Sequence, residues 1–211
     1  MTPKMLRRPT LYVMAKVPIA GRAKTRLAND IGPPRAIALN RWMTAKTLKA
    51  AVGGPWRTVL AVDPPVALSA KFTCWSRAEY RCPQVGGDLG ARLNAIVASA
   101  PVGPVGIIGV DAPLISRNAL QRAFAHLTSC DAVFGPADDG GFWFVGLRRL
   151  KPPPRYLFKN VRWSTEYSLQ DAAASLPTQY AVKYASQLSD LDDGSSLKAF
   201  NASDLCMSCL S

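Results

Sequence analysis

The chain of 211 residues has a single histidine, His126, and only two glutamates beside twelve aspartates. One histidine excludes metal sites that are built on several histidines and argues against a Ser-His-Asp triad. Because His126 falls within the helical spacing of Leu120, Phe124 and Leu127, we expect it on a helix surface. Short aspartate side chains favour loops, helix caps and metal sites, so the acidic chemistry is expected in loops.

Long hydrophobic runs are also missing. The longest clean runs are Leu11–Ala15, Val105–Val110 and Phe142–Val145, far short of the ~18 residues of a membrane span. The basic N-terminal segment is followed by an apolar run that is too short for a signal peptide. These absences predict a soluble, cytoplasmic protein without a membrane span.

Cysteine is present in an odd number, five, which does not fit a disulfide framework in a chain without a secretion signal. Cys206 and Cys209 have CxxC spacing but stand alone, whereas a structural zinc site needs four ligands. We therefore expect two thiols on a last helix rather than a zinc or redox site.

Positive charge is concentrated in one half of the chain. Residues 1–92 hold 16 basic and 4 acidic residues, whereas residues 93–211 hold 10 of each. Such a surface attracts phosphate-bearing partners, which include nucleotides, nucleic acids and anionic membranes. The sequence shows no helix-turn-helix, RNP aromatics or zinc module, so a nucleic acid is the less favoured partner.

Strands and helices alternate through most of the chain, which predicts one α/β domain over residues 1–211. Its expected architecture is a three-layer α/β/α domain with a mostly parallel mixed sheet. We expect strands at 11–15, 57–62, 105–110, 132–135, 141–147 and 179–184, with a weak one near Tyr80. The expected helices cover 33–51, 88–100, 116–127, 164–175 and 195–206.

Ligands of such sheets bind outside the carboxyl ends of the strands. The segments that follow three of the predicted strands are Lys16–Arg26, Asp111–Pro113 and Ala137–Gly141. These segments carry the most distinctive polar residues of the chain, so we expect them to converge on one rim.

The first of these segments is a candidate phosphate-binding loop. Gly21 permits close approach of the backbone to a ligand, and Lys24 and Arg26 supply positive charge. The loop matches neither the Walker P-loop nor GxGxxG, and an exposed basic loop is the alternative. The candidate phosphate ligands of this loop are Lys16, Gly21, Lys24, Thr25 and Arg26.

A second glycine-containing segment, 85–94, suits a loop that passes close to a base or a sugar. Its candidate nucleotide-binding residues are Gly87, Asp88 and Arg92. A helix N-cap is the alternative role for Asp88.

Carboxylates supply the candidate catalytic and metal-binding groups. Asp111 follows a buried strand that would hold it rigidly as a Mg²⁺ ligand, although a turn Asp before Pro is the alternative. Asp138 and Asp139 could hold or deprotonate an acceptor hydroxyl, or belong to a plain Asp-Gly hairpin turn. Asp192 could cap the last helix or supply a second metal ligand.

The ordered motifs KxPxxGxxKTRL, GGDLGxRL, IGxDxP, GPADDGGFWFVGL, WST and DLD span about residues 10–200. In this order they resemble a bacterial family of GT-A-like transferases, the radical-SAM/selenodomain-associated or arsenosugar-biosynthesis glycosyltransferases. That family belongs to the nucleotide-diphospho-sugar transferase superfamily. Molybdenum-cofactor guanylyltransferase and 2-phospho-lactate guanylyltransferase look like more distant relatives.

The resemblance implies a GT-A, Rossmann-like fold and a nucleotide-dependent transferase. It assigns Lys24 and Arg26 to phosphate binding, Asp111 to the Mg²⁺ position and Asp139 to a family acid. Asp192 would match a second metal carboxylate, but the family continues as DTPEDL and this chain does not.

Two transferase reactions fit these residues. The family's label favours glycosyl transfer from an NDP-sugar to a small-molecule acceptor. The basic loop and the single Asp of the 109–113 segment favour transfer of NMP from an NTP with release of pyrophosphate. Either reaction would use Mg²⁺ or Mn²⁺. A non-catalytic nucleotide or nucleic-acid binder is a further alternative, and the oligomeric state, including a homo-oligomer, is left open.

Overall fold

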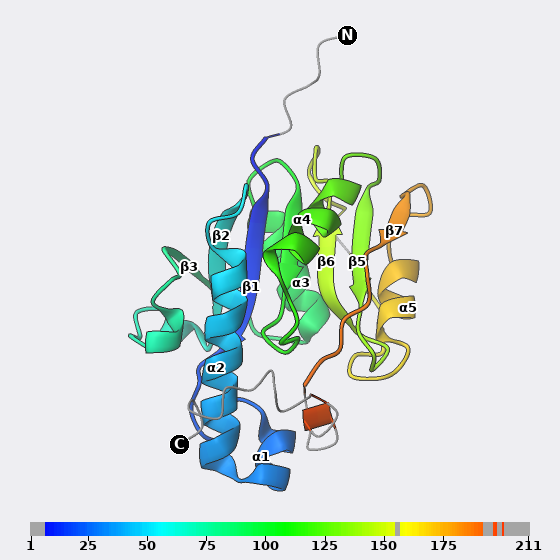
Figure 1. The fold of residues 1–211 in the computed structure, drawn as a ribbon. Helices are drawn as coiled ribbons and strands as arrows, with labels where there is room; N and C mark the ends of the chain where they lie inside the picture. The colour runs from blue at the N-terminus through cyan, green and yellow to red at the C-terminus, as the bar shows by residue number, and fades with distance from the viewer. Residues whose placement is uncertain (1–6, 155–156, 192–195, 198–199, 201–211) are drawn as a thin grey trace.

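The computed structural model describes residues 7–154, 157–191, 196–197 and 200. Within them the strands are β1 Thr10–Lys16, β2 Arg57–Asp63, β3 Tyr80–Pro83, β4 Val105–Ile108, β5 Ala132–Pro136, β6 Phe142–Leu147 and β7 Val182–Tyr184. They form one sheet in the order β3-β2-β1-β4-β6-β5-β7 (Figure 1). Among these strands only β6 runs antiparallel to its neighbours, β4 and β5. The predicted mostly parallel mixed sheet is therefore confirmed.

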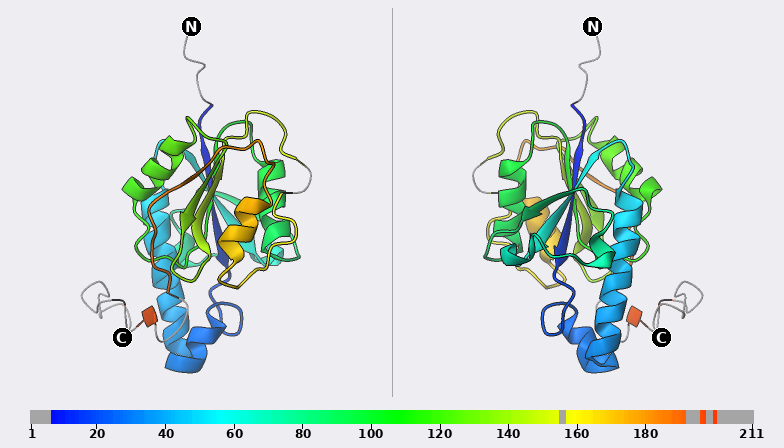
Figure 2. Two further views of the ribbon diagram at one scale, coloured as in Figure 1. Left: turned by 90° about the vertical axis from the view of Figure 1, so that its right-hand side faces the viewer. Right: turned by 90° about the vertical axis from the view of Figure 1, so that its left-hand side faces the viewer.

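Helices cover both faces of the sheet. They are α1 Thr25–Ile31, α2 Pro33–Ala51, α3 Leu89–Ser99, α4 Arg117–His126 and α5 Ser168–Ala174, with 3₁₀ turns η1 Pro65–Ala67 and η2 Thr73–Trp75. Helices α2 and α4 pack on one face of the sheet, and α3 and α5 pack on the other (Figure 2). The predicted three layers are confirmed. No helix of the described residues is long and apolar enough to cross a membrane.

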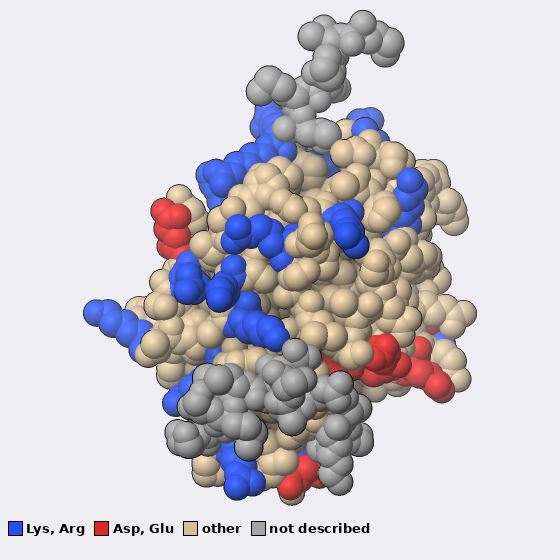
Figure 3. Space-filling model, in the orientation of Figure 1, with Lys and Arg blue, Asp and Glu red and all other residues tan. Residues whose placement is uncertain are grey.

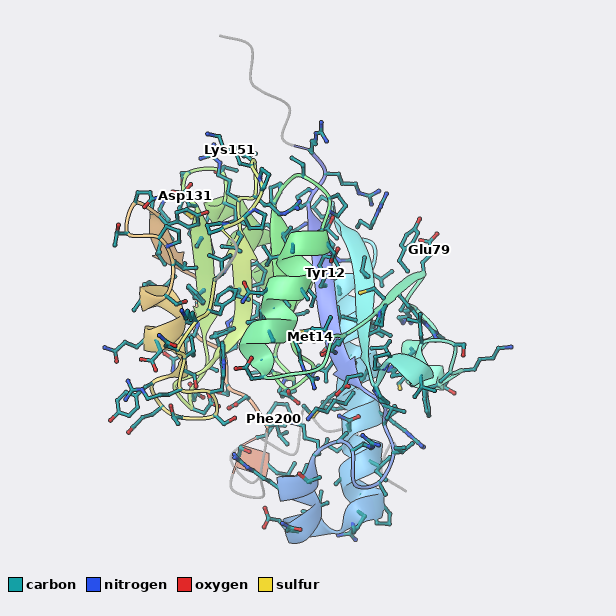
Figure 4. The ribbon with its side chains drawn as sticks, turned by 180° about the vertical axis from the view of Figure 1, so that it is seen from behind. Tyr12, Met14, Glu79, Asp131, Lys151 and Phe200 are labelled. Carbon is teal, nitrogen blue, oxygen red and sulfur yellow. The ribbon has the colours of Figure 1, made fainter. Side chains whose placement is uncertain are left out.

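Alternation along β1 explains why the sheet is covered on both sides. Leu11 and Val13 belong to the core cluster under α2 and α4, whereas Tyr12 packs in the cluster that contains α3. Successive strand side chains point to opposite faces, so an unbroken apolar strand needs a partner layer on each face. Figure 4, seen from behind, shows Tyr12 and Met14 on the α3 side.

Proline or a capping side chain marks the start of α2, α3 and α4. Pro33 begins α2, where the missing N–H of proline costs no helical hydrogen bond. The side chain of Asp88 accepts a hydrogen bond from Ala91 N at the start of α3. The hydroxyl of Ser116 accepts one from Ala119 N at the start of α4. Each cap satisfies an N–H that would otherwise lack a partner.

Two helices differ from the sequence prediction. Helix α1 was not expected, because its single buried residue, Leu27, gives no readable periodicity. Helix α5 begins four residues later than predicted, at Ser168. The preceding turn is held instead by the Ser168 hydroxyl, which donates to Arg162 O and accepts from Thr165 N. The predicted helix at 195–206, with Cys206 and Cys209, lies largely outside the described residues.

Candidate functional site

A cleft of ≈ 800 Å³ lies at the carboxyl-terminal edge of the parallel strands. The three rim segments predicted from the sequence all contribute to it. Eight predicted site residues line the cleft, namely Lys16, Lys24, Thr25, Arg26, Gly87, Arg92, Asp111 and Asp139. The structure therefore brings the phosphate loop, the glycine-containing segment and the candidate metal carboxylate into one cavity.

An ion pair joins the candidate phosphate-binding loop to the segment that follows β4. Lys24 Nζ lies 2.7 Å from Asp111 Oδ1, and the lysine side chain is 5% exposed whereas that of Asp111 is 51% exposed. The same ammonium donates to Leu191 O at 2.5 Å, and Leu191 N donates to Asp111 O at 2.9 Å. Asp111 is therefore accessible from the cleft, while Lys24 compensates its charge from the protein side.

Arg92 fixes the opposite wall of the cleft. Its guanidinium donates to Asp63 Oδ2 at 2.9 Å, to Gln84 Oε1 at 3.2 Å and to Gly87 O at 3.2 Å. Buried Gln84 is itself anchored by a bond to Ala61 O on β2. One cation thus ties the ends of β2 and β3 to the glycine-containing loop, a role that sequence spacing alone did not reveal for Asp63 and Gln84.

Three predicted residues do not line the cleft. The Asp88 carboxylate caps the start of α3 by accepting a hydrogen bond from Ala91 N. This is the alternative role that the sequence indicated for it. Gly21 is exposed at φ +74°, with nothing near the position of a Cβ. Gly21 is suited to this position because a positive φ favours glycine.

The third is Asp138, whose hydrogen-bond partners and position differ from those of its neighbour Asp139. The carboxylate of Asp138 accepts a 2.6 Å hydrogen bond from Gln187 Nε2. Hydrogen bonds from Ser189 and then Gln187 lower the pKa of Asp138, so this carboxylate is a poor proton acceptor. Asp139 accepts from Gly141 N at 2.7 Å and lines the cleft.

The segment Trp163–Glu166 also lines the cleft, and reasoning from individual residues missed it. Ser164 has φ +61°, an uncommon backbone conformation for a residue with a side chain. Gly140 packs so tightly against the Glu166 backbone that a Cβ there would overlap it, and Leu169 N donates to Gly140 O at 2.9 Å. The WST motif of the family resemblance was the one signal that marked this segment.

The carboxylates fit a divalent cation that is shared with a phosphorylated ligand. Among the described residues, no group of three or more His, Cys, Asp or Glu converges on a metal position. Mg²⁺ is commonly held by one or two carboxylates together with substrate phosphates and water. Asp111 meets that requirement, and Asp190 lines the same cleft. The proposed second ligand, Asp192, lies outside the described residues.

Solved structures with the same fold support this description of the architecture. A protein from Desulfovibrio desulfuricans G20, provisionally described as a nucleotide-diphospho-sugar transferase, is 23% identical with a TM-score of 0.77. The alignment covers 95% of this chain and 89% of that one. The 4-diphosphocytidyl-2C-methyl-D-erythritol synthase of Anaerococcus prevotii DSM 20548 is 9% identical over 93% and 95% of the two chains, with a TM-score of 0.59.

A third solved structure is that of Rv0371c from Mycobacterium tuberculosis H37Rv in complex with manganese. It is 14% identical over 91% of this chain and 97% of that one, with a TM-score of 0.54. These three likenesses establish an α/β fold of the GT-A-like kind.

A comparison with curated protein sequences found no match. A family model matches residues 45–165, which include β2 to β6 and much of the cleft. Because that match covers more than half of the chain, the protein belongs to the family described as "Uncharacterized protein conserved in bacteria (DUF2064)".

Proposed function

We propose that the protein is a metal-dependent transferase that uses a nucleotide-activated donor and transfers a glycosyl group from an NDP-sugar to a small-molecule acceptor. One observation carries the proposal: the accessible Asp111 carboxylate lies 2.7 Å from Lys24 in a cleft that Lys16, Arg26 and Arg92 also line. A carboxylate among several cations at the strand ends suits a phosphorylated donor that binds together with a metal ion.

The donor phosphates would occupy the basic side of the cleft. Lys16 ends β1, and Arg26 lies in the first turn of α1, so both are anchored in regular elements. Fixed cations stabilise the negative charge that develops on a leaving nucleoside diphosphate. Asp111 would hold the metal ion, which when bound would add Lewis-acid stabilisation of the same charge. Lys24, which is bonded to Asp111 and to Leu191 O, would add positive charge behind the carboxylate that holds the metal ion.

The acceptor would occupy the acidic and aromatic side of the cleft. Asp139 and Glu166 lie on two loops that touch each other, and the rings of Phe142 and Trp163 pack edge to face at 6.3 Å. Aromatic faces with adjacent carboxylates suit a hydroxyl-bearing acceptor, whose O–H groups donate to carboxylate oxygens. Asp139 would orient the attacking hydroxyl and accept its proton. The arsenosugar-type label of the resembling family is compatible with such an acceptor.

Nucleotidyl transfer from an NTP is the second candidate. It is favoured by the basic segment 16–26, whose Lys16, Lys24 and Arg26 line the same cleft as Asp111. The fold likeness to a 4-diphosphocytidyl-2C-methyl-D-erythritol synthase agrees with this alternative. In that reaction the same cations would neutralise the leaving pyrophosphate. A protein that binds nucleotide without turnover is the non-enzymatic alternative.

Thermal-shift titration with a panel of NTPs and NDP-sugars, with and without Mg²⁺ or Mn²⁺, tests the proposal. A ligand at ~100 times its dissociation constant stabilises the folded state by about 2.7 kcal/mol. We expect a metal-dependent shift with NDP-sugars that is lost in Asp111→Asn and kept in the matched control Asp131→Asn. A preference for NTPs would select nucleotidyl transfer. The absence of a shift with every nucleotide would overturn the proposed site.

A further inference from the structure

A second group of cations lies at the edge of the sheet opposite the cleft. In the strand register Thr10 pairs with Arg57 and with Val105, and Val105 pairs with Leu147. The residues just before β1 and β4, at the start of β2 and just after β6 therefore share one edge. The basic edge, as we name it, consists of Arg7, Arg8, Arg57, Arg148, Arg149 and Lys151. Arg148 and Arg149 are half-buried, with guanidinium nitrogens inside the protein, and the other four side chains are exposed.

Hydrogen bonds hold the segments of the basic edge together. Arg57 N donates to Pro9 O at 2.8 Å, and Gly103 N donates to Arg149 O at 3.0 Å. The Arg8 guanidinium donates to Trp56 O at 3.0 Å. The cations thus stand on a rigid rim of strand ends rather than on independent loops.

Negative charge does little to neutralise the basic edge. The acidic residues nearby are Asp131 and Glu79, and Figure 4 shows Asp131 and Lys151 on the same rim. The Asp131 carboxylate accepts a hydrogen bond from Ala181 N. Within the described part of the chain no ion pair includes any of the six cations. Figure 3 shows Lys and Arg along this rim at the top of the view.

Apolar side chains project beside these cations. Val102 is 41% exposed and Leu150 is 48% exposed. They are brought side by side by the Gly103–Arg149 hydrogen bond, because each is the chain neighbour of one member of that pair. Exposed prolines, Pro101 and Pro152, flank them. Two exposed aliphatic side chains next to exposed cations combine apolar insertion with attraction to anionic headgroups.

We propose that the basic edge docks the protein on an anionic lipid bilayer, with its exposed cations, Arg7, Arg8, Arg57 and Lys151, against phosphate headgroups and with Val102 and Leu150 in the interface. The aliphatic tips favour a bilayer over RNA, since single-stranded RNA is usually held by stacking on aromatic side chains. In this orientation the cleft, at the opposite edge of the sheet, faces away from the membrane. The proposal does not depend on the transferase activity.

Co-sedimentation of the full chain with vesicles tests the docking. We expect binding to phosphatidylcholine vesicles with about 30% phosphatidylserine, but not to phosphatidylcholine alone, and a steep loss of binding with salt. In Arg7→Glu/Lys151→Glu the partition coefficient should fall at least about 25-fold, since each lost cation accounts for about fivefold. The matched control Lys71→Glu/Arg77→Glu changes two exposed cations of the segment between β2 and β3, which line neither the cleft nor the basic edge, and should lose less than about threefold.

A second variant, Val102→Ser/Leu150→Ser, separates insertion from charge. It should weaken vesicle binding while the salt dependence stays unchanged. Equal binding to neutral vesicles, or an equal loss in the Lys71→Glu/Arg77→Glu control, would overturn the proposal. So would the absence of vesicle binding together with tight, salt-sensitive RNA binding that Arg7→Glu/Lys151→Glu abolishes. Nucleotide-induced thermal shifts, which report on the cleft, should be the same in all four proteins.

Discussion

The two edges of the sheet both carry many cations, but they use them differently. At the carboxyl-terminal edge Lys24 pairs with Asp111 and Arg92 pairs with Asp63. At the basic edge, within the described residues, arginines donate to backbone carbonyls and have no carboxylate partner. Paired charges set fixed positions inside a cavity, whereas unpaired charges produce a diffuse field over a surface. The first arrangement suits a small ligand and the second suits an extended anionic partner.

The substitution Asp111→Asn should have the largest effect on the paired edge. It removes the carboxylate that we assign to the metal ion, and turnover with the donor found in the nucleotide panel should fall on the order of 10²–10³-fold. Single-turnover kinetics would measure this loss, with Asp131→Asn as the control at the other edge. An Asp111→Asn protein with normal turnover would remove the functional distinction between the two edges.

Gly140→Ala tests whether the loops of the cleft are held to one another. Gly140 has φ +82°, and an added Cβ would overlap the Glu166 backbone. We expect a loss of about 3 kcal/mol in the free energy of unfolding. Gly21→Ala, at φ +74° with no neighbour near the Cβ, should cost only about 1 kcal/mol. Urea denaturation of both variants gives the comparison, and equal losses would show that backbone strain alone acts at these positions.

Arg92→Met and Lys151→Met compare a paired cation with an unpaired one. Arg92 bonds to Asp63, Gln84 and Gly87, and its side chain is 22% exposed. Its loss leaves partly buried acceptors without a donor and should cost about 2 kcal/mol. Lys151 is exposed without an ion partner among the described residues, and its loss should change stability by less than about 0.5 kcal/mol. Denaturant unfolding measures both, and a similar cost at the two sites would contradict the contrast.

Asp171→Asn should give the smallest effect, because its ion pair with Arg162 lies at the protein surface. Hydrogen bonds from the Arg162 side chain and backbone lower the pKa of Asp171 to about 2. A depressed pKa means that the pair stabilises the fold above pH ~4 and loses that contribution as the pH falls towards 2. Wild type and Asp171→Asn should therefore differ in unfolding free energy at pH 7 and converge near pH 2. If the difference in unfolding free energy grew as the pH fell, the pKa of Asp171 would not be lowered in the folded state.

Much of the fold could be predicted from the sequence, because local chemistry fixes the beginnings and ends of elements. The alternative role of Asp88 as a cap, the prolines that begin α2 and the apolar strands all lie where their patterns placed them. Short elements without periodicity could not be predicted in this way, as α1 shows. The start of α5 also escaped prediction, because Ser168 holds a turn through bonds to Arg162 and Thr165.

The candidate site was also predictable from the sequence only in part. That the segments after β1, β4 and β5 would meet follows from the rule that strand ends share an edge. The direction of individual side chains does not follow from it. Asp138 and Asp139 are neighbours with the same chemistry, yet only Asp139 lines the cleft, since Gln187 holds the other carboxylate. Their assignment as acceptor ligands stays a prediction.

The sequence by itself determined the α/β layers, the caps and the presence of a basic half, because these depend on periodicity, on residues a few positions apart and on composition. Only the tertiary structure decided which cations are paired. Lys24 meets Asp111 from 87 residues away, and Arg8, Arg57 and Arg149 gather at one edge through strand register. Such contacts depend on which strands become neighbours and on how their side chains point, and no local pattern encodes either.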